Sequence, residues 1–446
     1  MRKIRENQLR LMPSWVDHPH AKELEAMSRL LDGNPAIASL AMKDLADDAR
    51  AANGAPGMTA DQVVRVAVLK QLNGFSYDEL AFHVQDSACY RAFLSLGWGE
   101  AAPGRATLAE NVRRLTSATW EAISRVLVGT AREEGVERGE KLRIDGTVVE
   151  TNILAPADSD LLWDAVRVLT RWLSRADAAG LGVTCPRVAR KAKRRSFLIK
   201  FTRGKDKRLA PYRELIALAE QAILAAEVAQ PILAVRAERL AVRAAAKLQR
   251  YLPLARRVLE QARRRVLQGE TVPSREKLLS IFEPHSEVIV KGTRAPQFGL
   301  KVTFTVGASR LVLDCLIETH TPRDADIMPK MVERALAQNG AAPRQVALDG
   351  GYASRANLAH AKALGVQDVC FSKHVGLELT DMVTSSTVYK RLWRFRAGIE
   401  GCVSFLKRGF GLGRCTWRGE AAYGSYVWAS VATYNLLLLA RHQLAH

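Results

Sequence analysis

Segments typical of β-strands occur in two places, separated by a long stretch with helical spacing. The first is the apolar segment LRIDGTVVETN at 142–152. After Pro273 the segments FGLKVTFTVG and RLVLDCLIETH alternate or run apolar around a short Gly-Ala-Ser turn. Between these places, residues 157–284 have the apolar spacing of helices, beginning with Leu161, Leu162, Val166, Leu169 and Leu173. One strand of the sheet therefore precedes a helical insertion, and the other strands follow it.

The chain after Pro273 continues with helices and strands in alternation. A helix is predicted over about 325–338, a strand ends just before Asp349, a helix follows at about 355–364, and VQDVCFSK is a further strand. A helix with Glu400 comes next, and an apolar helix closes the chain. We therefore predict an α/β fold with a mixed sheet, flanking helices, a helical insertion between the first two strands and an all-helical N-terminal domain.

Short helices dominate the N-terminal third of the chain. One is predicted around 21–31, a second opens at Thr59 and stops at Gly74, and a third is capped by Ser76. Thr107 is predicted to cap a further helix in PGRATLAENVRRLT. Short helices joined by tight turns are compatible with a helix-turn-helix-like, DNA-binding bundle, but many bundles that do not bind DNA have the same pattern.

The charge balance points to a polyanionic partner. The chain has 66 Lys and Arg against 46 Asp and Glu, a formal net charge of +20. The alternative is a basic protein with no nucleic-acid role.

Basic residues are densest between Arg187 and Arg213, where twelve Lys or Arg stand against the single acidic residue Asp206. Aromatic residues are interleaved with them, a composition suited to phosphate contacts and base stacking. The alternative is a solvated basic loop. The candidate DNA-binding residues of this segment are Arg190, Lys191, Lys193, Arg194 and Arg195.

The cysteines and apolar segments indicate a protein of a reducing compartment. Six scattered cysteines include no C-x2-C pair and predict no zinc site. The N-terminal segment MRKIRENQLRLMPSW lacks the apolar core of a signal peptide. The longest apolar run, 426–440, is short and contains Ser430, Thr433 and Asn435, so it predicts a core helix and not a membrane span.

Three carboxylates have settings that can face one cleft. Asp145 is predicted at the end of a short strand, Asp349 just after another at a Gly-Gly turn, and Glu400 on an amphipathic helix beside Arg396 and Lys407. Magnesium prefers oxygen ligands, and two-metal phosphodiester cleavage needs carboxylates around ions about 3.5–4 Å apart. In this hypothesis Asp145 bridges both ions, and Asp349 and Glu400 each hold one.

Each carboxylate also has a simpler explanation. Asp145 is compatible with a turn or bulge, Asp349 with an ordinary Asx turn, and Glu400 with an exposed helix position paired to Arg396. Other carboxylates compete for the role, although their contexts are poorer: Glu150, Asp314, Asp324, Asp326 and Glu378.

The spacing R-x3-E-x6-K at Arg396, Glu400 and Lys407, with Trp393 three residues before the arginine, resembles the signature of bacterial insertion-sequence transposases of the DDE class. The best-known members have Tyr where this chain has Trp393. The segments IDGTVVETN, LDGGY, IFEPHSEVIVKG, FGLKV and YNLL also resemble family segments. LKQLNGFSYDELAFHVQDSACYRAFLSLG resembles the helical domain that commonly precedes the catalytic core.

The resemblance implies an RNase H-like core and two Mg2+ or Mn2+ ions held by Asp145, Asp349 and Glu400. It implies binding of double-stranded DNA, namely terminal inverted repeats and target DNA, with hydrolytic nicking followed by attack of the new 3′-OH on the target. On the helix itself, Arg396 and Lys407 would contact phosphates. Trp393 would stack on an unpaired base, or it packs in the core. A homodimer on DNA and a cytoplasmic, nucleoid-associated location in a bacterium are also expected.

These expectations define a domain hypothesis. It comprises an N-terminal helical arm (1–54), a helical DNA-binding domain (55–140), a catalytic domain (141–156 and 285–446) and a basic helical insertion (157–284). Two other functions stay open: an RNase H-like nuclease or resolvase without strand transfer, and a catalytically inactive, transposase-derived DNA-binding protein.

Overall fold

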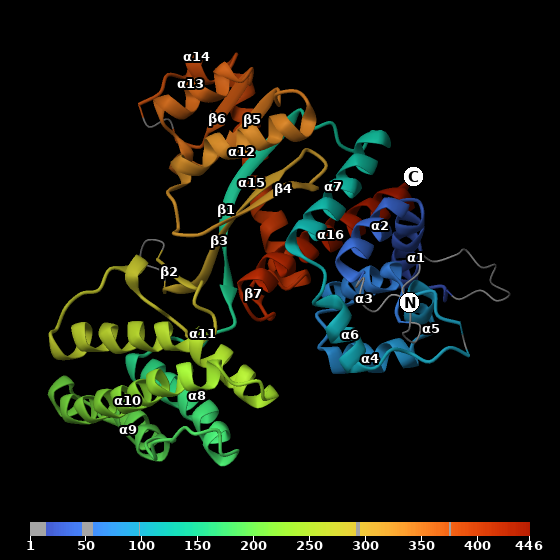
Figure 1. Cartoon of the computed structure of the whole chain (residues 1–446). Coiled ribbons are helices and arrows are strands. Elements are labelled where there is room, and N and C mark those ends of the chain that lie inside the picture. Colours follow the sequence, from blue (N-terminus) through green and yellow to red (C-terminus); the bar gives the residue numbers. More distant parts are fainter. Residues whose placement is uncertain (1–14, 47–56, 98, 291–294, 374–375) are drawn as a thin grey trace. The chain divides into compact units, whose positions relative to one another are not determined.

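The computed structural model describes residues 15–46, 57–97, 99–290, 295–373 and 376–446. The chain forms two compact units. The sheet unit comprises Met1–Glu150 and Lys301–His446, and the helical unit comprises Thr151–Leu300. Figure 1 labels the elements of each unit.

The sheet unit contains a mixed sheet with the order β4-β3-β1-β5-β6, and β7 pairs with β1. Its strands are β1 (Lys141–Thr151), β3 (Gln297–Val306), β4 (Val312–Glu318), β5 (Gln345–Leu348), β6 (Asp368–Phe371) and β7 (Arg414–Cys415). β3 and β4 are antiparallel, whereas β5 is parallel to both β1 and β6. The predicted mixed α/β, RNase H-like arrangement is confirmed.

Helices from the second half of the chain pack on this sheet. They are α12 (Asp324–Asn339), α13 (Arg355–Ala363), α14 (Leu379–Met382) and α15 (Ser386–Gly409). α15 packs against β5 and β6, and α12 packs against β4. The predicted helices at 325–338 and 355–364 are thus confirmed as α12 and α13.

The N-terminal region is all helical, and its helices pack partly on the C-terminal helix. It contains α1 (Pro19–Asp32), α2 (Pro35–Leu45), α3 (Ala60–Asn73), α4 (Tyr77–Asp86), α5 (Ala88–Phe93), α6 (Arg105–Val112) and α7 (Ser117–Glu133). α16 (Glu420–Ala445) packs against α1, α3 and α7. The first predicted arm, 1–54, contains α2 as well as the expected helix, while residues 1–14 and 47–56 lie outside the described part of the chain.

The cap predictions for this region are right at two positions and wrong at a third. Thr59 and Ser76 each close a reciprocal capping box at the start of α3 and α4. Gly74 ends α3 in the left-handed conformation, with φ of 67°. Thr107 is not a cap, because α6 begins two residues earlier at Arg105 after the extended Gly104.

The C-terminal apolar run is a core helix, as predicted. Its polar side chains are buried and satisfied, because the Ser430 and Thr433 hydroxyls donate to carbonyls one turn earlier. Asn435 accepts from the Val312 amide and donates to the Val312 carbonyl on β4. These bonds tie α16 to the sheet without exposing polar groups to the apolar interior.

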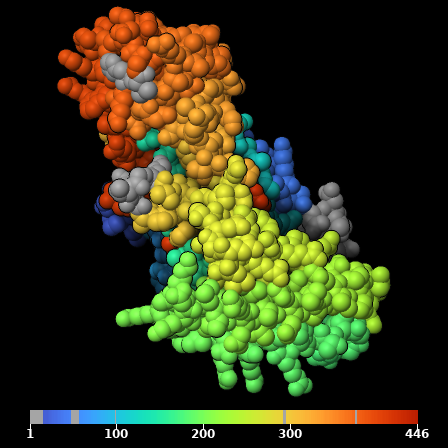
Figure 2. Space-filling view, turned by 90° about the vertical axis from the view of Figure 1, so that its left-hand side faces the viewer, coloured from blue at the N-terminus to red at the C-terminus, as the bar shows by residue number. Residues whose placement is uncertain are grey.

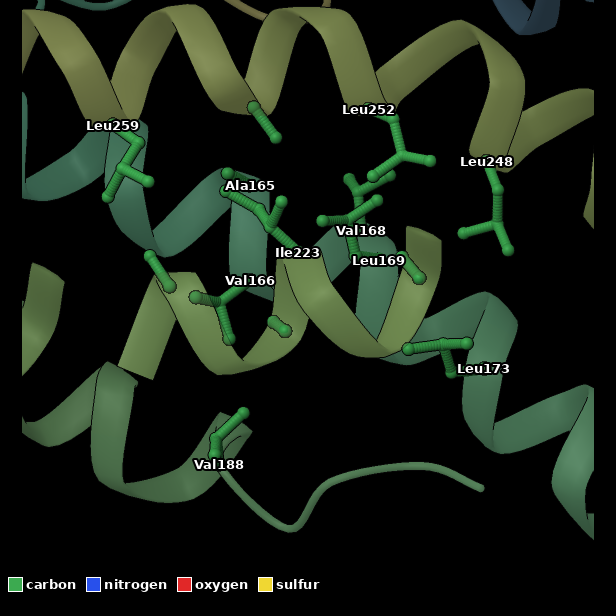
Figure 3. Close-up of a cluster of buried hydrophobic side chains, with 14 of the residues drawn as sticks. Ala165, Val166, Val168, Leu169, Leu173, Val188, Ile223, Leu248, Leu252 and Leu259 are labelled. Atoms are coloured by element: carbon green, nitrogen blue, oxygen red, sulfur yellow. The ribbon is translucent and has the colours of Figure 1, made fainter. Parts of the chain in front are cut away.

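The helical unit is a bundle followed by short irregular elements. It contains α8 (Asp158–Ala178), α9 (Ala189–Phe201), α10 (Lys205–Ala234), α11 (Arg239–Ala262), a π-helical turn η1 (Arg263–Leu267), a 3-10 turn η2 (Ser274–Glu276) and β2 (Glu287–Ile289), which pairs with the start of β3. Side chains of α8, α10 and α11 meet in an apolar core, where Figure 3 shows Leu169, Ile223 and Leu252. All five residues that predicted the first helix are buried in this core.

Two helices of the bundle contain a proline. Pro231 lies inside α10, and Pro253 lies inside α11. Each proline removes one backbone hydrogen bond, and the packing of both helices against α8 offsets that loss. Within the described residues, α10 is the helix whose length and composition would suit a membrane span, and its buried side chains instead belong to this core.

Candidate active site

Strand pairing in the sheet unit brings two of the three predicted carboxylates next to each other. Ile144 on β1 pairs in parallel register with Leu348 on β5. Asp145 directly follows Ile144, and Asp349 directly follows Leu348. Because neighbouring strands lie about 4.8 Å apart, the two aspartates are at adjacent positions. Asp349 directly follows β5, as predicted. Asp145 is not at a strand end, because β1 continues to Thr151.

Asp349 lies in a setting that favours its charged form. Its Oδ1 accepts a hydrogen bond from the Ser372 hydroxyl at 2.5 Å. Burial by itself raises the pKa of Asp349. The hydrogen bonds from Ser372 and the Gly350 amide, together with the charges of Arg396 and Lys373, outweigh burial, so the pKa of Asp349 lies below its ordinary value. Asp349 is therefore ionised at neutral pH, the state that a metal ligand requires.

The side chain of Asp145 is bonded to the backbone of the next residue. Its Oδ1 accepts a hydrogen bond from the Gly146 amide at 2.7 Å. Arg143, two residues earlier, lies on the same face of β1 as Asp145, since alternate residues of a strand share a face. Arg143 contacts α15, so this face of β1 is directed toward the helix that contains Glu400.

Glu400 and Arg396 lie on one side of α15. Nη2 of Arg396 and Oε1 of Glu400 are 3.4 Å apart. Arg396 also acts on the charge of Asp349, so its guanidinium lies in the field of both carboxylates. The Glu400 side chain is 68% exposed, whereas that of Arg396 is 14% exposed.

The three carboxylates do not form a ready metal cage. Among the described residues, no group of three or more His, Cys, Asp or Glu side chains is arranged to hold a metal ion. The donor chemistry nevertheless fits a hard divalent cation, because neighbouring strands supply two carboxylates at adjacent register positions. Glu400 differs from the two aspartates, because it lies on α15 and pairs with Arg396.

The other residues predicted on α15 lie along the same helix. Lys407 is half-buried near its end. Trp393 lies nearer its start and is 47% exposed, an unusual exposure for so large an apolar ring. Spacings of four and seven residues keep Arg396, Glu400 and Lys407 on one stripe of the helix.

Arg143 links β1 to α15, and the sequence analysis did not single it out. Its side chain is buried, its Nη1 donates to the Phe395 carbonyl at 3.1 Å, and its guanidinium lies 4.6 Å from the centre of the Phe395 ring. A Cβ at Gly398 would lie 2.2 Å from Nη1, so this close approach requires glycine. The available signal was an arginine within an apolar strand segment.

A second missed group lies beside Gly146. A Cβ at Gly146 would meet Lys301 Cε at 3.2 Å, the Tyr352 hydroxyl at 3.3 Å and Thr303 Oγ1 at 3.4 Å. Lys301 forms an ion pair with Asp324, a carboxylate that the sequence analysis had ranked as a poor candidate. Burial, reinforced by the charges of Asp324, Asp145 and Asp349, raises the pKa of Tyr352. The available signal was the alternation of Lys301 and Thr303 in an otherwise apolar strand.

The predicted DNA-binding residues of the basic segment lie on α9 in the helical unit. This segment is therefore a helix and not the basic loop of the alternative explanation. Arg190, Lys193 and Arg194 are exposed. Lys191 and Arg195 pair with Glu214 at 3.6 and 2.8 Å. The exposed Phe197 and Phe201 rings lie 4.5 Å apart. Long side chains project from the green surface of this unit in Figure 2.

Two family models match the chain. One, described as a transposase domain (DUF772), matches residues 5–114. The other, described as a transposase DDE domain, matches residues 285–436, which include Asp349 and Glu400. The chain belongs to the DDE transposases. Searches of curated proteins and of solved structures give no match.

Membership of this family establishes the general activity of the protein. It is a DNA transposase and an enzyme, its family binds DNA, and DDE transposases generally use divalent metal ions. Asp145 lies between the two matched segments, so its assignment depends on the register of β1 with β5 and not on the family matches.

Proposed function

We propose that this transposase cleaves DNA at the ends of its insertion sequence and joins those ends to target DNA by two-metal phosphoryl transfer. Asp145, Asp349 and Glu400 are the proposed metal ligands. The observation that supports this most strongly is the parallel pairing of Ile144 with Leu348, which sets two aspartates side by side. The field of Arg396 on Asp349 supports the inclusion of α15.

The carboxylates suit Mg2+, or Mn2+ in its place, because both ions accept oxygen ligands. When bound, such ions supply activation of the attacking hydroxyl and stabilisation of the leaving oxygen. Asp145 would bridge the two ions, while Asp349 and Glu400 would each hold one. The Ser372 hydroxyl fixes the orientation of the Asp349 carboxylate.

Glu400 would become a metal ligand after its ion pair with Arg396 breaks. Its side chain is largely exposed, and an i,i+4 ion pair on a helix contributes only about 0.3–0.5 kcal/mol. Arg396 would then be available for a DNA phosphate next to the scissile bond. Lys407 would contact a phosphate farther along the same helix stripe, and Trp393 would stack on an unpaired base.

The proposed partners are double-stranded DNA at the terminal inverted repeats and in the target. The exposed basic side chains of α9 would bind the DNA backbone. A homodimer is proposed because two element ends must be cut and joined together, and a cytoplasmic, nucleoid-associated location follows from the substrate. The domain hypothesis of the sequence analysis stays a prediction.

Strand cleavage and joining on a labelled duplex with the element's own end tests the proposal. Wild type is compared with Asp145→Asn, in the presence of Mg2+ or Mn2+. We expect nicked and joined products from wild type and a loss of at least about a hundredfold in the variant. Glu150→Gln is the matched control, because Glu150 lies on the same strand but pairs with Arg414 at 2.8 Å.

The outcomes separate the alternatives. Cleavage without joining would point to a nuclease or resolvase. DNA binding with no cleavage by wild type or variant would point to an inactive DNA-binding derivative. Equal cleavage by wild type and Asp145→Asn would contradict the assignment of Asp145.

A further inference from the structure

Asp349 lies at the start of a short 3-10 turn, η3 (Gly350–Tyr352), and its place in the sheet unit depends on that turn. The Tyr352 amide closes the turn by donating to the Asp349 carbonyl at 3.2 Å. At the end of β6, the Ser372 hydroxyl accepts from the Gly350 amide at 2.8 Å and donates to the Asp349 carboxylate. The turn also packs against α12, so two elements determine where it lies.

The Asn357 side chain joins η3 to the start of α12. Asn357 lies in the first turn of α13 and is buried. Its Nδ2 donates to the Tyr352 carbonyl and to the Ala325 carbonyl, each at 2.8 Å. An amide nitrogen has two donor hydrogens, and here each is used by a different segment. One side chain therefore fixes the turn after Asp349 relative to α12.

Asp324, the first residue of α12, contacts the same turn. A Cβ added at Gly351 would lie 2.8 Å from Oδ2 of Asp324, so the carboxylate lies directly against the backbone of η3. Asp324 forms an ion pair with Lys301 on β3, and Lys301 Nζ also donates to the Pro322 carbonyl at 2.9 Å. Because Lys301 is buried, these partners offset the cost of its charge and hold Asp324 in place.

We propose that Asn357 and Asp324 are positioning residues for Asp349, which act through η3, and that Lys301 acts on Asp349 by holding Asp324. The inference rests on the proposed role of Asp349 as a metal ligand. Residues that hold metal ligands in place change metal affinity by about 10- to 100-fold without touching the ion. The Ser372 hydroxyl orients the carboxylate group, whereas these contacts place the backbone from which it projects.

Calorimetric titration of the full chain with Mn2+ tests the inference. Asn357→Ala should weaken Mn2+ binding by about tenfold, because η3 is no longer bonded to α12. Without metal, hydrogen exchange should become faster in the peptide that contains Asp349.

Asn435→Ala is the matched control for Asn357→Ala. Asn435 is a buried asparagine of the same unit, and its carboxamide bonds to the amide and the carbonyl of Val312. Its truncation removes hydrogen bonds of the same kind, so it should also lower the temperature of thermal unfolding. It should leave the Mn2+ affinity unchanged, which a purely structural role of Asn357 would not distinguish.

Gly351→Ala disturbs the contact with Asp324 without removing a buried hydrogen bond, since Gly351 is exposed. The added methyl group would displace the Asp324 carboxylate, so Mn2+ binding should weaken by up to about tenfold. In an Asp324→Ala background, Gly351→Ala should cause no further loss, because the colliding group is absent. Gly129→Ala on α7, where no described atom lies within 4 Å of an added Cβ, is the control and should match wild type.

The outcomes separate this inference from the proposed function. Wild-type Mn2+ affinity in Asn357→Ala and Gly351→Ala, beside a loss in Asp349→Asn, would overturn the positioning role and leave the metal assignment intact. Wild-type affinity in Asp349→Asn would overturn the metal assignment and the positioning role with it. An equal loss of Mn2+ affinity in Asn357→Ala and Asn435→Ala would show a general effect of stability, and would also overturn the positioning role.

Discussion

The helical unit and the sheet unit stabilise their interiors in different ways. The helical unit packs Leu, Ile, Val and Ala side chains of α8, α10 and α11 into one apolar core. The sheet unit also buries charged groups, including Arg65, Arg143, Lys301 and Asp314. A buried charge is costly unless it is paired and hydrogen-bonded. Of the described residues, the helical unit buries fewer charges, including Asp158, which is bonded to Gln261 and Arg265. The difference teaches that apolar spacing does most of the work in the first unit, whereas the second depends more on polar partners brought together from distant segments.

Arg65 provides the sharpest test of this contrast. It is 0% exposed and donates to Asp61, Asp32, Ser28 and the Phe93 carbonyl at 2.7–2.8 Å. Arg65→Met leaves these acceptors without their donor, so we expect a loss of about 3–5 kcal/mol in the sheet unit. Hydrogen exchange should show faster opening of α1 and α3 and unchanged protection of α8.

The matched control for Arg65 is Arg29→Met. Arg29 is 58% exposed and pairs only one turn away, with Glu25 at 3.5 Å. We expect a change within about 0.5 kcal/mol. If Arg65→Met behaved like Arg29→Met, the buried arginine would not organise the N-terminal helices, and the contrast between the two units would fail.

Leu169→Ala tests the apolar core of the helical unit. Leu169 is 0% exposed in the core of α8, α10 and α11, so its truncation leaves a cavity. We expect a loss of about 3 kcal/mol, confined to exchange protection in this bundle. Val242→Ala on α11, where Val242 is 52% exposed, is the control and should cost less than about 0.5 kcal/mol. Equal effects of the two truncations would contradict the assigned core.

The sequence predicts the apolar core of the helical unit better than the buried polar contacts of the sheet unit. Leu161, Leu169 and the other periodic positions of α8 predicted buried residues correctly, because helical spacing is local information. The role of Arg143 could not be predicted in this way, since its acceptor, the Phe395 carbonyl, is 252 residues away. Local propensity alone would break α10 at Pro231 and α11 at Pro253, but both helices continue through the proline because packing overrides local propensity.

In the candidate site, the positions of the two aspartates could be predicted from the sequence, and the position of Glu400 could not. The apolar segments before Asp145 and Asp349 predicted two strands, and their parallel register brings the aspartates together. The place of Glu400 relative to them depends on how α15 packs, and the ion pair with Arg396 was visible in the sequence only as a spacing of four. The roles of all three carboxylates stay predictions.

The smallest expected effect on stability concerns the basic face of α9. Arg190 and Arg194 are exposed, so the double variant Arg190→Gln, Arg194→Gln should change stability by less than about 0.5 kcal/mol. The slope of log DNA affinity against log salt should fall by about two, because two phosphate contacts are lost.

Arg195→Gln is the control for this face, because the guanidinium of Arg195 is bonded to Glu214 at 2.8 Å. It should retain most of the wild-type slope. A double variant of Arg190 and Arg194 with the wild-type slope would show that the basic face of α9 is a solvated surface and not a DNA contact.

Binding of Mn2+ to the full chain, measured by calorimetric titration, tests the central claim that three carboxylates form one metal site. We predict that Asp145→Asn and Asp349→Asn each weaken binding by at least about tenfold, that Glu400→Gln weakens it less, and that the control Glu150→Gln leaves it unchanged. Equal Mn2+ affinity in wild type and in all three carboxylate variants would contradict the claim.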